Sequence, residues 1–274
     1  MPQPRKTPAE APPPPERNAG PSVIQRVMAI LGLFSPGQTQ ISVEQIAEAL
    51  AMSPASAYRY ASELTQAGLL ARSSGSFRLG PKIIELEYLI RHHDPVISAA
   101  QDLMEGLAEL TGSDVLLCNF YEDAIVNVSH VRGRWPVQIT YTKGLPMPLF
   151  RGSQAHVVLA HLDRRKLRRL YDDGLADPAL AADVQAMGAD WSAFMNTLKR
   201  IRDDGHYISR GELDADVVGI AAPVFGSAGE IVSSIVVARS LAAPSKLSEE
   251  SLLALVKQTA QELSRRLKGA TAAP

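Results

Sequence analysis

The segment Ser53-Pro54-Ala55-Ser56-Ala57-Tyr58-Arg59-Tyr60 decides the fold of the first part of the chain. Serine is a preferred residue at the N-cap of a helix, and proline suits the first helical position because its missing N–H would have no partner there. Gly68 follows at the place of a helix C-cap. We therefore predict a helix between Pro54 and Gly68 that buries one side and exposes polar residues on the other. Its predicted buried side is formed by Ala57, Tyr60, Ala61 and Leu64.

Two shorter helices are predicted before this segment and a hairpin after it. Ser22 and Ser42 are N-cap candidates, and each is followed by apolar residues at helical spacing. After the third helix, a turn at 73–76 separates two short strands at 69–72 and 77–79. Three helices and a hairpin are the elements of a winged helix-turn-helix. Its third helix enters the DNA major groove, and its hairpin, the wing, reaches the phosphates or the minor groove.

The candidate DNA-contacting residues are small, hydroxyl-bearing or basic, and lie on the second and third helices and the wing. They are Ser42, Ser53, Ala55, Ser56, Tyr58, Arg59, Ser62, Arg72 and Arg78. Residues 22–80 carry four arginines and three glutamates, which is a net charge of only +1. Because non-specific affinity follows the number of phosphates neutralised, one copy would bind weakly, and we predict a homodimer or homotetramer on double-stranded operator DNA. The alternative is a winged-helix adaptor that binds only protein.

A further helix is predicted over 82–92, directly after Gly80-Pro81. It is more apolar than a solvated linker needs to be, so we expect it to pack against a partner chain. The N-terminal residues are rich in proline, alanine and charge, which is typical of disorder. The predicted organisation is a disordered tail (1–21), a winged helix-turn-helix domain (22–81), a linker helix (82–95), a second domain (96–268) and a tail (269–274).

The second domain alternates helices and strands. Helices are predicted near 96–111, 152–163, 164–172, 191–204 and 248–267. Strands are predicted near 114–120, 124–131, 136–141, 206–211, 217–224 and 231–238. The turn signals Glu122-Asp123 and Ser227-Ala228-Gly229 join neighbouring strands into hairpins. We therefore predict an α+β fold in which helices pack on an antiparallel sheet.

Composition excludes several classes of protein. The chain has 274 residues, a net charge of −1 and a single cysteine, Cys118, so it is neither a polycation nor a disulfide or multi-cysteine zinc scaffold. It contains no apolar run long enough to cross a membrane and no signal peptide, and we expect it in the cytoplasm. His92-His93-Asp94 lacks further ligands at helical spacing, and no phosphate-binding loop is present. We expect no metal and no cofactor.

Several stretches of the chain together resemble the IclR family of bacterial transcription regulators. They are 27–31, 42–47, 53–60, 77–80, 107–112, 144–149, 201–207 and 220–224. The resemblance covers about residues 22–268. It implies that the second domain is a GAF-like effector-binding domain, with the ligand on the sheet below a loop that leads into a helix near Gly152.

The sequence departs from the family pattern where small polar groups are replaced by apolar residues and arginines. The candidate effector-binding residues are Phe150, Arg151, Gly152, Ser153, Arg210, Glu212, Gly219, Val236, Ala238 and Arg239. Arginine forks recognise carboxylates, and Gly219 and Ala238 leave room. We therefore predict a small carboxylate effector larger than glyoxylate or pyruvate, for example an aromatic acid. The alternative is that Arg151, Arg210 and Arg239 face solvent or pair with Glu212 and Asp214.

The resemblance implies a ligand-responsive DNA-binding transcriptional regulator, a repressor or an activator, which we expect to control a catabolic operon. The alternative class is an enzyme that converts a small acid. Such an enzyme would need a nucleophile–base pair or a set of metal ligands, and the sequence motifs favour neither.

Overall fold

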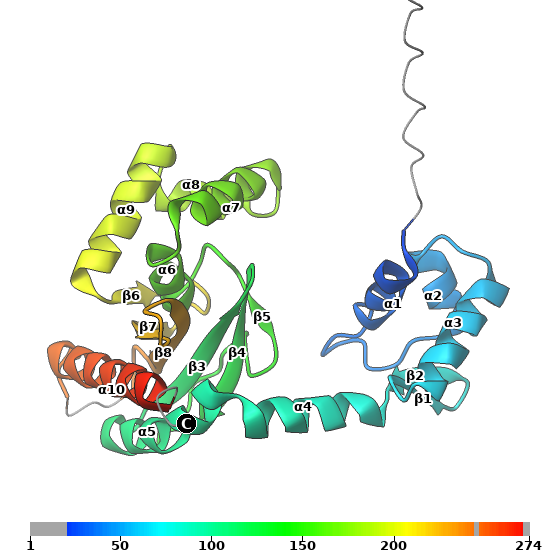
Figure 1. Cartoon of the computed structure of the whole chain (residues 1–274), viewed down its shortest axis with the longest axis horizontal. Helices are drawn as coiled ribbons and strands as arrows, with labels where there is room; N and C mark the ends of the chain where they lie inside the picture. Colours follow the sequence, from blue (N-terminus) through cyan, green and yellow to red (C-terminus); the bar gives the residue numbers. More distant parts are fainter. Residues whose placement is uncertain (1–20, 244–246, 271–274) are drawn as a thin grey trace, which may run out of the picture. The chain divides into compact units, whose positions relative to one another are not determined.

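The computed structural model describes residues 21–243 and 247–270. Contacts divide the chain into one unit that ends at Ile90 and another that begins at Arg91, and the elements of each can be followed in Figure 1. Apart from Pro21, the predicted N-terminal tail lies outside the described residues, as does 271–274 of the predicted C-terminal tail. Within the described ranges, no helix combines the length and the apolar character that crossing a membrane requires.

The first unit holds the predicted helices and hairpin. They are α1 (Val23–Leu31), α2 (Val43–Ala49), α3 (Pro54–Gln66), β1 (Leu70–Ser73) and β2 (Ser76–Leu79). The predicted N-caps Ser22, Ser42 and Ser53 are confirmed, because each serine Oγ accepts a hydrogen bond from the backbone N–H three residues on. α1 ends at Leu31. Gly32 caps it and donates to Met28 O and Ile30 O, so the helix stops before Ser35-Pro36-Gly37.

The core of the first unit lies between the three helices and the hairpin. Tyr60 and Leu64 of α3 are buried there with Ile41 and Phe77, which also pair through their backbones. Gly80 closes the hairpin against the end of α3, where a Cβ would lie only 2.2 Å from Gly68 O. Only a glycine fits this close backbone approach. The next helix, α4 (Pro81–His93), was predicted over 82–92, and it has no buried residue along its described length.

The second unit is built on an antiparallel sheet of six strands in the order β5-β4-β3-β8-β7-β6. The strands are β3 (Asp114–Tyr121), β4 (Ala124–Val131), β5 (Pro146–Met147), β6 (Tyr207–Arg210), β7 (Val217–Phe225) and β8 (Ile231–Ser240). The predicted antiparallel α+β architecture is confirmed. The predicted strand at 136–141 is wrong: β5 takes the edge of the sheet, and 136–141 has no strand structure.

The reason lies in side chains that take up the backbone N–H groups of this segment. Asp114, which is fully buried, accepts from Gly133 N at 2.8 Å and from Val137 N at 3.4 Å, and lies 3.1 Å from His130 Nε2. Burial alone would raise the pKa of Asp114, but these hydrogen bonds outweigh it and hold the pKa below its ordinary value. Within 136–141, Val137 N donates to Asp114 and Thr140 N donates to Asp214, so carboxylates replace a strand ladder as hydrogen-bond partners.

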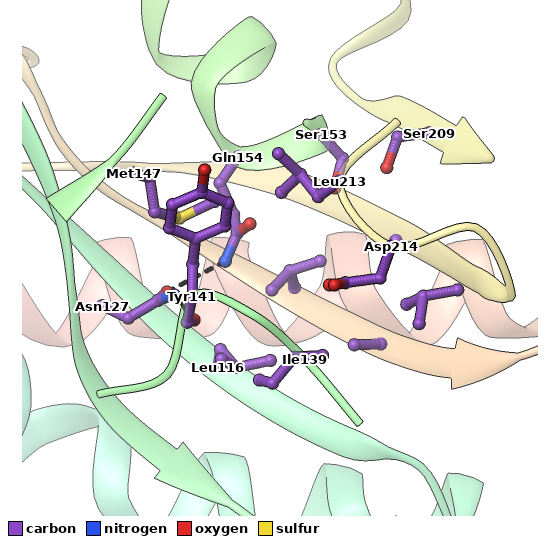
Figure 2. A pocket seen from close by; sticks show the side chains of 14 residues that line it. Leu116, Asn127, Ile139, Tyr141, Met147, Ser153, Gln154, Ser209, Leu213 and Asp214 are labelled. Atoms are coloured by element: carbon purple, nitrogen blue, oxygen red, sulfur yellow. Dashed lines mark hydrogen bonds between the residues drawn. The ribbon is translucent and has the colours of Figure 1, made fainter. Parts of the chain in front are cut away.

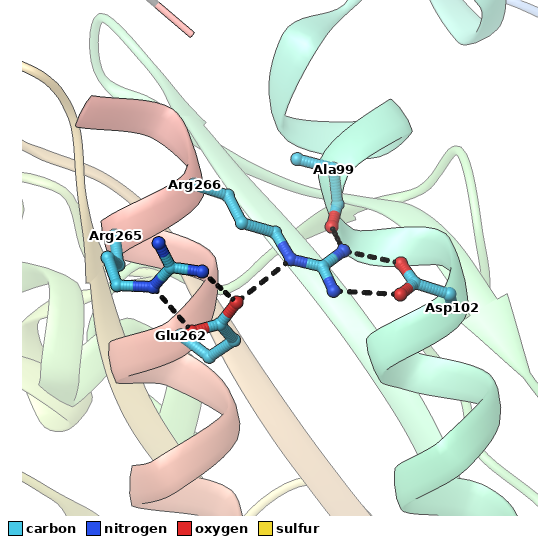
Figure 3. A network of polar contacts seen from close by, with 5 residues as sticks. All are labelled: Ala99, Asp102, Glu262, Arg265 and Arg266. Carbon is cyan, nitrogen blue, oxygen red and sulfur yellow. Dashed lines mark hydrogen bonds and ion pairs between the residues drawn. The ribbon is translucent and has the colours of Figure 1, made fainter. Parts of the chain in front are cut away.

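Helices cover both faces of the sheet, as Figure 1 shows. One face carries α5 (Pro95–Thr111) and α10 (Glu249–Ala270), and the other carries α6 (Ser153–Ala160), α7 (Arg164–Ala176), α8 (Ala181–Met187) and α9 (Trp191–Asp204). The short helix α8 was not predicted, and α7 continues four residues beyond the expected end at 172. Figure 3 shows Arg266 of α10 bonded to both carboxylate oxygens of Asp102 and to Ala99 O, which joins α10 to α5.

Candidate functional site

The exposed side of the first unit carries the residues predicted to contact DNA. Ser53, Ala55, Tyr58, Arg59, Arg72 and Arg78 are exposed, and Ser42, Ser56 and Ser62 are half-buried. Two of the serines act as helix caps. Ser42 Oγ accepts from Gln45 N, while Ser53 Oγ accepts from Ser56 N and donates to Ser56 Oγ at 3.0 Å. Their hydroxyls therefore stabilise the N-terminal turns of α2 and α3. In a helix-turn-helix, the N-terminal residues of the recognition helix are the ones that contact base edges.

Tyr58 and Arg72 join the third helix to the wing. Arg72 Nη2 donates to Tyr58 OH at 3.1 Å, and the guanidinium lies 5.4 Å from the centre of the Tyr58 ring. Arg59 Nε lies 4.0 Å from Glu63 Oε1, one turn along α3, and both side chains are about two-thirds exposed. An exposed pair of this kind is weak, so the Arg59 guanidinium is available to a phosphate or a base edge.

A cavity in the second unit lies between the sheet and the start of α6 (Figure 2). Its lining comes from segments that lie far apart in the sequence. The residues are Leu116, Asn127, Ile139, Tyr141, Met147, Ser153, Gln154, Ser209, Leu213, Asp214, Val217, Gly219, Val236 and Ala238. The cavity volume is about 40 Å³, which holds roughly three water molecules.

Two hydroxyl groups meet at one end of this cavity. Ser153 and Ser209 are buried, and neither side chain has a hydrogen-bond partner within the described ranges. Both lie over Gly219, where a Cβ would come within 2.6 Å of Ser153 Oγ and 2.9 Å of Ser209 Oγ. Gly219 is therefore required for these two hydroxyls to occupy the same end of the cavity.

The N-terminus of α6 opens at the same place. Gly152 is its N-cap with φ of 87°, a left-handed conformation that favours glycine, and no side chain caps the helix. The first N–H groups of a helix carry a partial positive charge and need partners, so an uncapped N-terminus beside a cavity attracts an anion.

A partly buried cluster of polar side chains holds this helix end in place. Glu212 accepts from Gly152 N at 2.9 Å and from Tyr207 OH at 3.0 Å. His156 Nδ1 lies 2.8 Å from Gly152 O, which can only accept, so Nδ1 carries the proton. The imidazole stacks on the Tyr207 ring at 4.4 Å. Burial lowers the pKa of His156 and raises that of Tyr207 to about 12, so both groups are neutral near pH 7.

The other polar residues of the cavity shape its wall. Gln154 Nε2 donates to Asn127 Oδ1 at 3.0 Å, and Asn127 Nδ2 donates to Tyr141 O, as the dashed lines of Figure 2 partly show. Asp214 accepts from the N–H and the hydroxyl of Thr140. These bonds tie the irregular segment that carries Ile139 and Tyr141 across the cavity.

The structure brings some of the predicted effector residues to the cavity and places others elsewhere. Ser153, Gly219, Val236 and Ala238 line it, and Gly152 and Glu212 form its braced edge. Phe150 is a core residue that packs edge-on against Phe194. Arg151 lies 3.5 Å from Asp183, and is not among the lining residues.

Arg210 and Arg239 lie on the opposite face of the sheet. Arg210 pairs with Glu249 of α10, and Arg239 donates to Ala243 O. The register explains this placement, because Arg210, Val218 and Arg239 are neighbours across three strands, as are Ser209, Gly219 and Ala238. Successive residues of a strand point to opposite faces of the sheet. A cavity lined by Ser209, Gly219 and Ala238 therefore cannot also be lined by Arg210 and Arg239.

Sequence reasoning missed most of the polar lining. Asn127, Tyr141, Gln154, Ser209 and Asp214 were not predicted as effector residues, although Ser209 and Gln154 directly adjoin residues that were. A buried asparagine in the apolar strand β4 was a usable signal at Asn127, which is 1% exposed. Within the described part of the chain, no group of three or more His, Cys, Asp or Glu could hold a metal ion.

Two family models match the chain. The IclR helix-turn-helix domain matches residues 23–74, and the bacterial transcriptional regulator IclR C-terminal domain matches residues 88–265. Among curated proteins, the HTH-type transcriptional regulator KipR of Bacillus subtilis is 23% identical over 248 residues. The match covers 89% of this chain and 96% of KipR.

Solved structures share the fold. An IclR transcriptional regulator from Silicibacter sp. superposes with a TM-score of 0.73 at 22% identity, covering 92% of this chain and 97% of that one. An IclR homologue from Microbacterium hydrocarbonoxydans, complexed with 4-hydroxybenzoate, superposes with a TM-score of 0.71 at 18% identity, covering 90% and 100%. Because the C-terminal family model alone matches more than half of the residues, this chain belongs to the IclR family of DNA-binding bacterial transcriptional regulators.

Proposed function

We propose that this regulator senses a small aromatic carboxylate in its second unit and binds operator DNA through paired winged helix-turn-helix domains, controlling a catabolic operon. One observation carries the choice of ligand. The hydroxyls of two buried residues, Ser153 and Ser209, have no partner in the described residues and lie over Gly219 beside the uncapped N-terminus of α6. Hydroxyl donors and free helix N–H groups together make a receptor for a carboxylate.

The rest of the cavity supports an apolar body on that ligand. Apolar side chains also line it, among them Leu116, Ile139, Met147, Leu213 and Val236. A related IclR protein is complexed with 4-hydroxybenzoate, a molecule with one carboxylate and an apolar ring. The arginines of the original prediction have no part in this proposal, because Arg210 and Arg239 lie on the other face of the sheet.

The size of the cavity makes ligand binding and movement inseparable in this proposal. A volume of about 40 Å³ cannot take an aromatic acid, so the segment that carries Ile139 and Tyr141 must move outward when the acid enters. A ligand shifts an equilibrium only when it binds two states with different affinity. The shift of this segment would supply that difference, and operator affinity would follow it.

The test of the ligand class is calorimetry on the full chain. We expect 4-hydroxybenzoate and benzoate to bind, and 4-hydroxybenzamide, which lacks the charge, to bind at least tenfold more weakly. The double variant Ser153→Ala/Ser209→Ala should lose about tenfold in affinity for the acids, whereas Ser227→Ala in an exposed turn should lose none. Equal affinity for acid and amide would contradict the proposal, as would chemical conversion of the bound acid, which the enzyme alternative requires.

The DNA-binding residues of this proposal are those of the exposed side of α3 and the wing, together with Ser42. Arg59→Ala should weaken operator binding by about 10- to 30-fold, because the loss of one charged contact occurs in every copy of an oligomer. Titration of labelled upstream DNA at several salt concentrations measures this effect, with Arg168→Ala of α7 as the control for net charge. Binding of protein partners alone, without salt-dependent DNA binding in either ligand state, would favour the adaptor alternative.

The proposed pairing uses the apolar residues that the first unit exposes. Ile24 of α1 is 74% exposed, and Ile84, Tyr88 and Ile90 of α4 are 72%, 54% and 55% exposed. A second copy would cover this surface and double the number of phosphate contacts. Ile84→Glu should shift the chain toward the monomer in sedimentation velocity, whereas Thr39→Glu in an exposed loop of the same unit should not. An oligomer that is unchanged in Ile84→Glu would contradict this interface.

A further inference from the structure

A second hollow of this unit is a cleft formed by the C-terminal end of α9, strand β7 and helix α10. Its volume is about 530 Å³, which falls in the range of ordinary ligand pockets, about 300–1,000 Å³. The lining residues are His161, Arg202, Asp203, Asp204, Gly205, Ala222, Pro223, Phe225, Lys257, Ala260, Gln261, Ser264, Arg265 and Lys268. None of them lines the cavity of the proposed effector.

Positive charge predominates in this cleft. Four basic side chains line it against two acidic ones. Arg265 is paired with Glu262, as Figure 3 shows, and Lys257 Nζ donates to Asp204 O at 2.9 Å. Arg202 and Lys268 have no carboxylate partner within 4.0 Å among the residues that the structure describes. At least two cations are therefore free to bind an anion, and a third, Lys257, is held only by a neutral carbonyl.

His161 adds a buried polar atom that lacks a partner. Its Nε2 is inaccessible to solvent and has no hydrogen bond within the described ranges, while the ring packs edge-on against Phe225 at 5.0 Å. Burial, together with the nearby charge of Arg202, lowers the pKa of His161 to about 4, so the imidazole is neutral near pH 7. A neutral imidazole can donate through Nε2, and a buried donor without an acceptor is costly to leave unpaired.

We infer that this cleft is a second ligand site, which binds a small oxyanion with two or more negative charges, a phosphate compound or a polycarboxylate. The oxygens of the anion would accept from His161 Nε2 and pair with Arg202, Lys257 and Lys268. Asp203 and Asp204 at the same rim select against neutral or weakly charged molecules, because only a multiply charged anion gains enough from the cations to outweigh them.

Calorimetry with pyrophosphate and with citrate, at matched ionic strength, tests the site and separates the two sources of the charge. We expect at least one of them to bind at one site per chain, with acetate at least tenfold weaker. Binding of pyrophosphate alone assigns a phosphate compound, and binding of citrate alone assigns a polycarboxylate. Absence of binding for both anions, or equal binding of acetate, overturns the inference.

A charge-matched pair of variants locates the binding. Arg202→Gln/Lys257→Gln removes two cations of the cleft, and Lys199→Gln/Arg200→Gln removes two exposed cations of α9 that do not line it. The first variant should weaken binding of the anion at least tenfold, and the second less than twofold. Equal losses in both variants would mean that net charge alone attracts the anion, which overturns the site.

The role of His161 has its own readout. His161→Phe keeps a ring against Phe225 and removes the unpaired nitrogen, so the melting temperature without ligand should be unchanged or higher. Anion affinity should nevertheless fall about fivefold. Unchanged anion affinity in a folded His161→Phe protein would show that His161 does not contact the anion. If His161→Phe does not fold, the double variant of Arg202 and Lys257 tests whether the anion binds in this cleft. Affinity for 4-hydroxybenzoate should be the same in all these variants. The second site and the proposed effector cavity are therefore tested independently of each other.

Discussion

The two faces of the sheet at strands β6, β7 and β8 carry opposite chemistry one residue apart. On one face, Ser209, Gly219 and Ala238 form the floor of a small cavity with two free hydroxyls. On the other, Arg210 and Arg239 flank Val218 below α10 and find partners there. Strongly charged residues in these strands therefore do not mark the face that carries the proposed effector cavity. In this sheet, the face of the proposed effector cavity is marked by small residues and by hydroxyls without partners.

The largest effect that follows from this difference is on Gly219. Gly219→Ala puts a methyl group within 3 Å of both hydroxyls in a cavity with room for only a few water molecules. We expect aromatic acid affinity to fall about 100-fold, or about 2.7 kcal/mol, with operator affinity of the ligand-free protein within twofold of normal. Calorimetry and DNA titration measure the two, with Gly106→Ala as the control because its Cβ meets no atom within 4 Å. A normal affinity for the aromatic acid in Gly219→Ala would contradict the placement of the ligand above Gly219.

A second effect concerns Asp114, which holds the segment that crosses the cavity face. Asp114→Asn replaces a fully buried carboxylate that binds His130 and two backbone N–H groups, and should cost about 2 kcal/mol of stability at pH 7. The pKa of Asp114 is lower in the folded than in the unfolded state. Its contribution is therefore present above the ordinary pKa near 4 and is lost as the pH falls through the lower folded value.

Urea unfolding from pH 7 down to pH 3 measures this linkage. The difference between the normal protein and Asp114→Asn should be largest near neutrality and shrink in acid. Asp102→Asn, at the exposed ion pair between α5 and α10, provides a control on the other face of the sheet. A difference that stays constant across this pH range would show that the charge of Asp114 is not what holds the segment.

A smaller effect is expected at Tyr207, which lies on the cavity side of β6 and braces the N-terminus of α6 through Glu212. Tyr207→Phe removes one partly buried hydrogen bond and keeps the ring stacked on His156. We expect about 1 kcal/mol less stability and about threefold weaker binding of the acid. Thermal unfolding and calorimetry give the two values, and Tyr121→Phe at the exposed end of β3 is the matched control. Full affinity for the acid in Tyr207→Phe would show that the hydrogen bond from Tyr207 to Glu212 does not support ligand binding.

The smallest effect is expected on the arginine face. Arg210→Ala and Arg239→Ala should leave acid affinity within twofold of normal, because strand alternation directs both side chains away from the cavity. Parallel calorimetry of these variants and of Ser209→Ala measures the effect, and Ser209 and Arg210 are neighbouring positions of β6. A tenfold loss in either arginine variant would restore the original carboxylate-fork hypothesis.

Local signals explain why the first unit was easier to predict than the second. Its serine caps, its turn and its third-helix pattern act over three to five residues, and the exposed side of α3 follows from helical spacing alone. The cavity of the second unit draws on Asn127, Tyr141, Gln154, Ser209 and Asp214, which are up to 87 positions apart, from 127 to 214. No short-range pattern connects such residues.

The irregular segment at 136–141 shows the same limit from another side. Its alternating residues predict a strand, but Asp114 and Asp214 accept its N–H groups, and the segment crosses the cavity as a covering loop instead. Those partners lie more than 20 positions away in sequence. Whether the N–H groups of this segment bond to a neighbouring strand or to a carboxylate therefore depends on the folded structure.

The sequence by itself determined the family, the winged helix-turn-helix, the antiparallel α+β class and the helix that follows the wing, because periodicity, caps and turns act locally. Only the tertiary structure decided which residues of the sheet line the small cavity, which hydroxyls are left without partners, and where the cations of α9 and α10 gather. These depend on strand register and on the packing of distant segments, and one residue of register exchanges every side chain between the two faces.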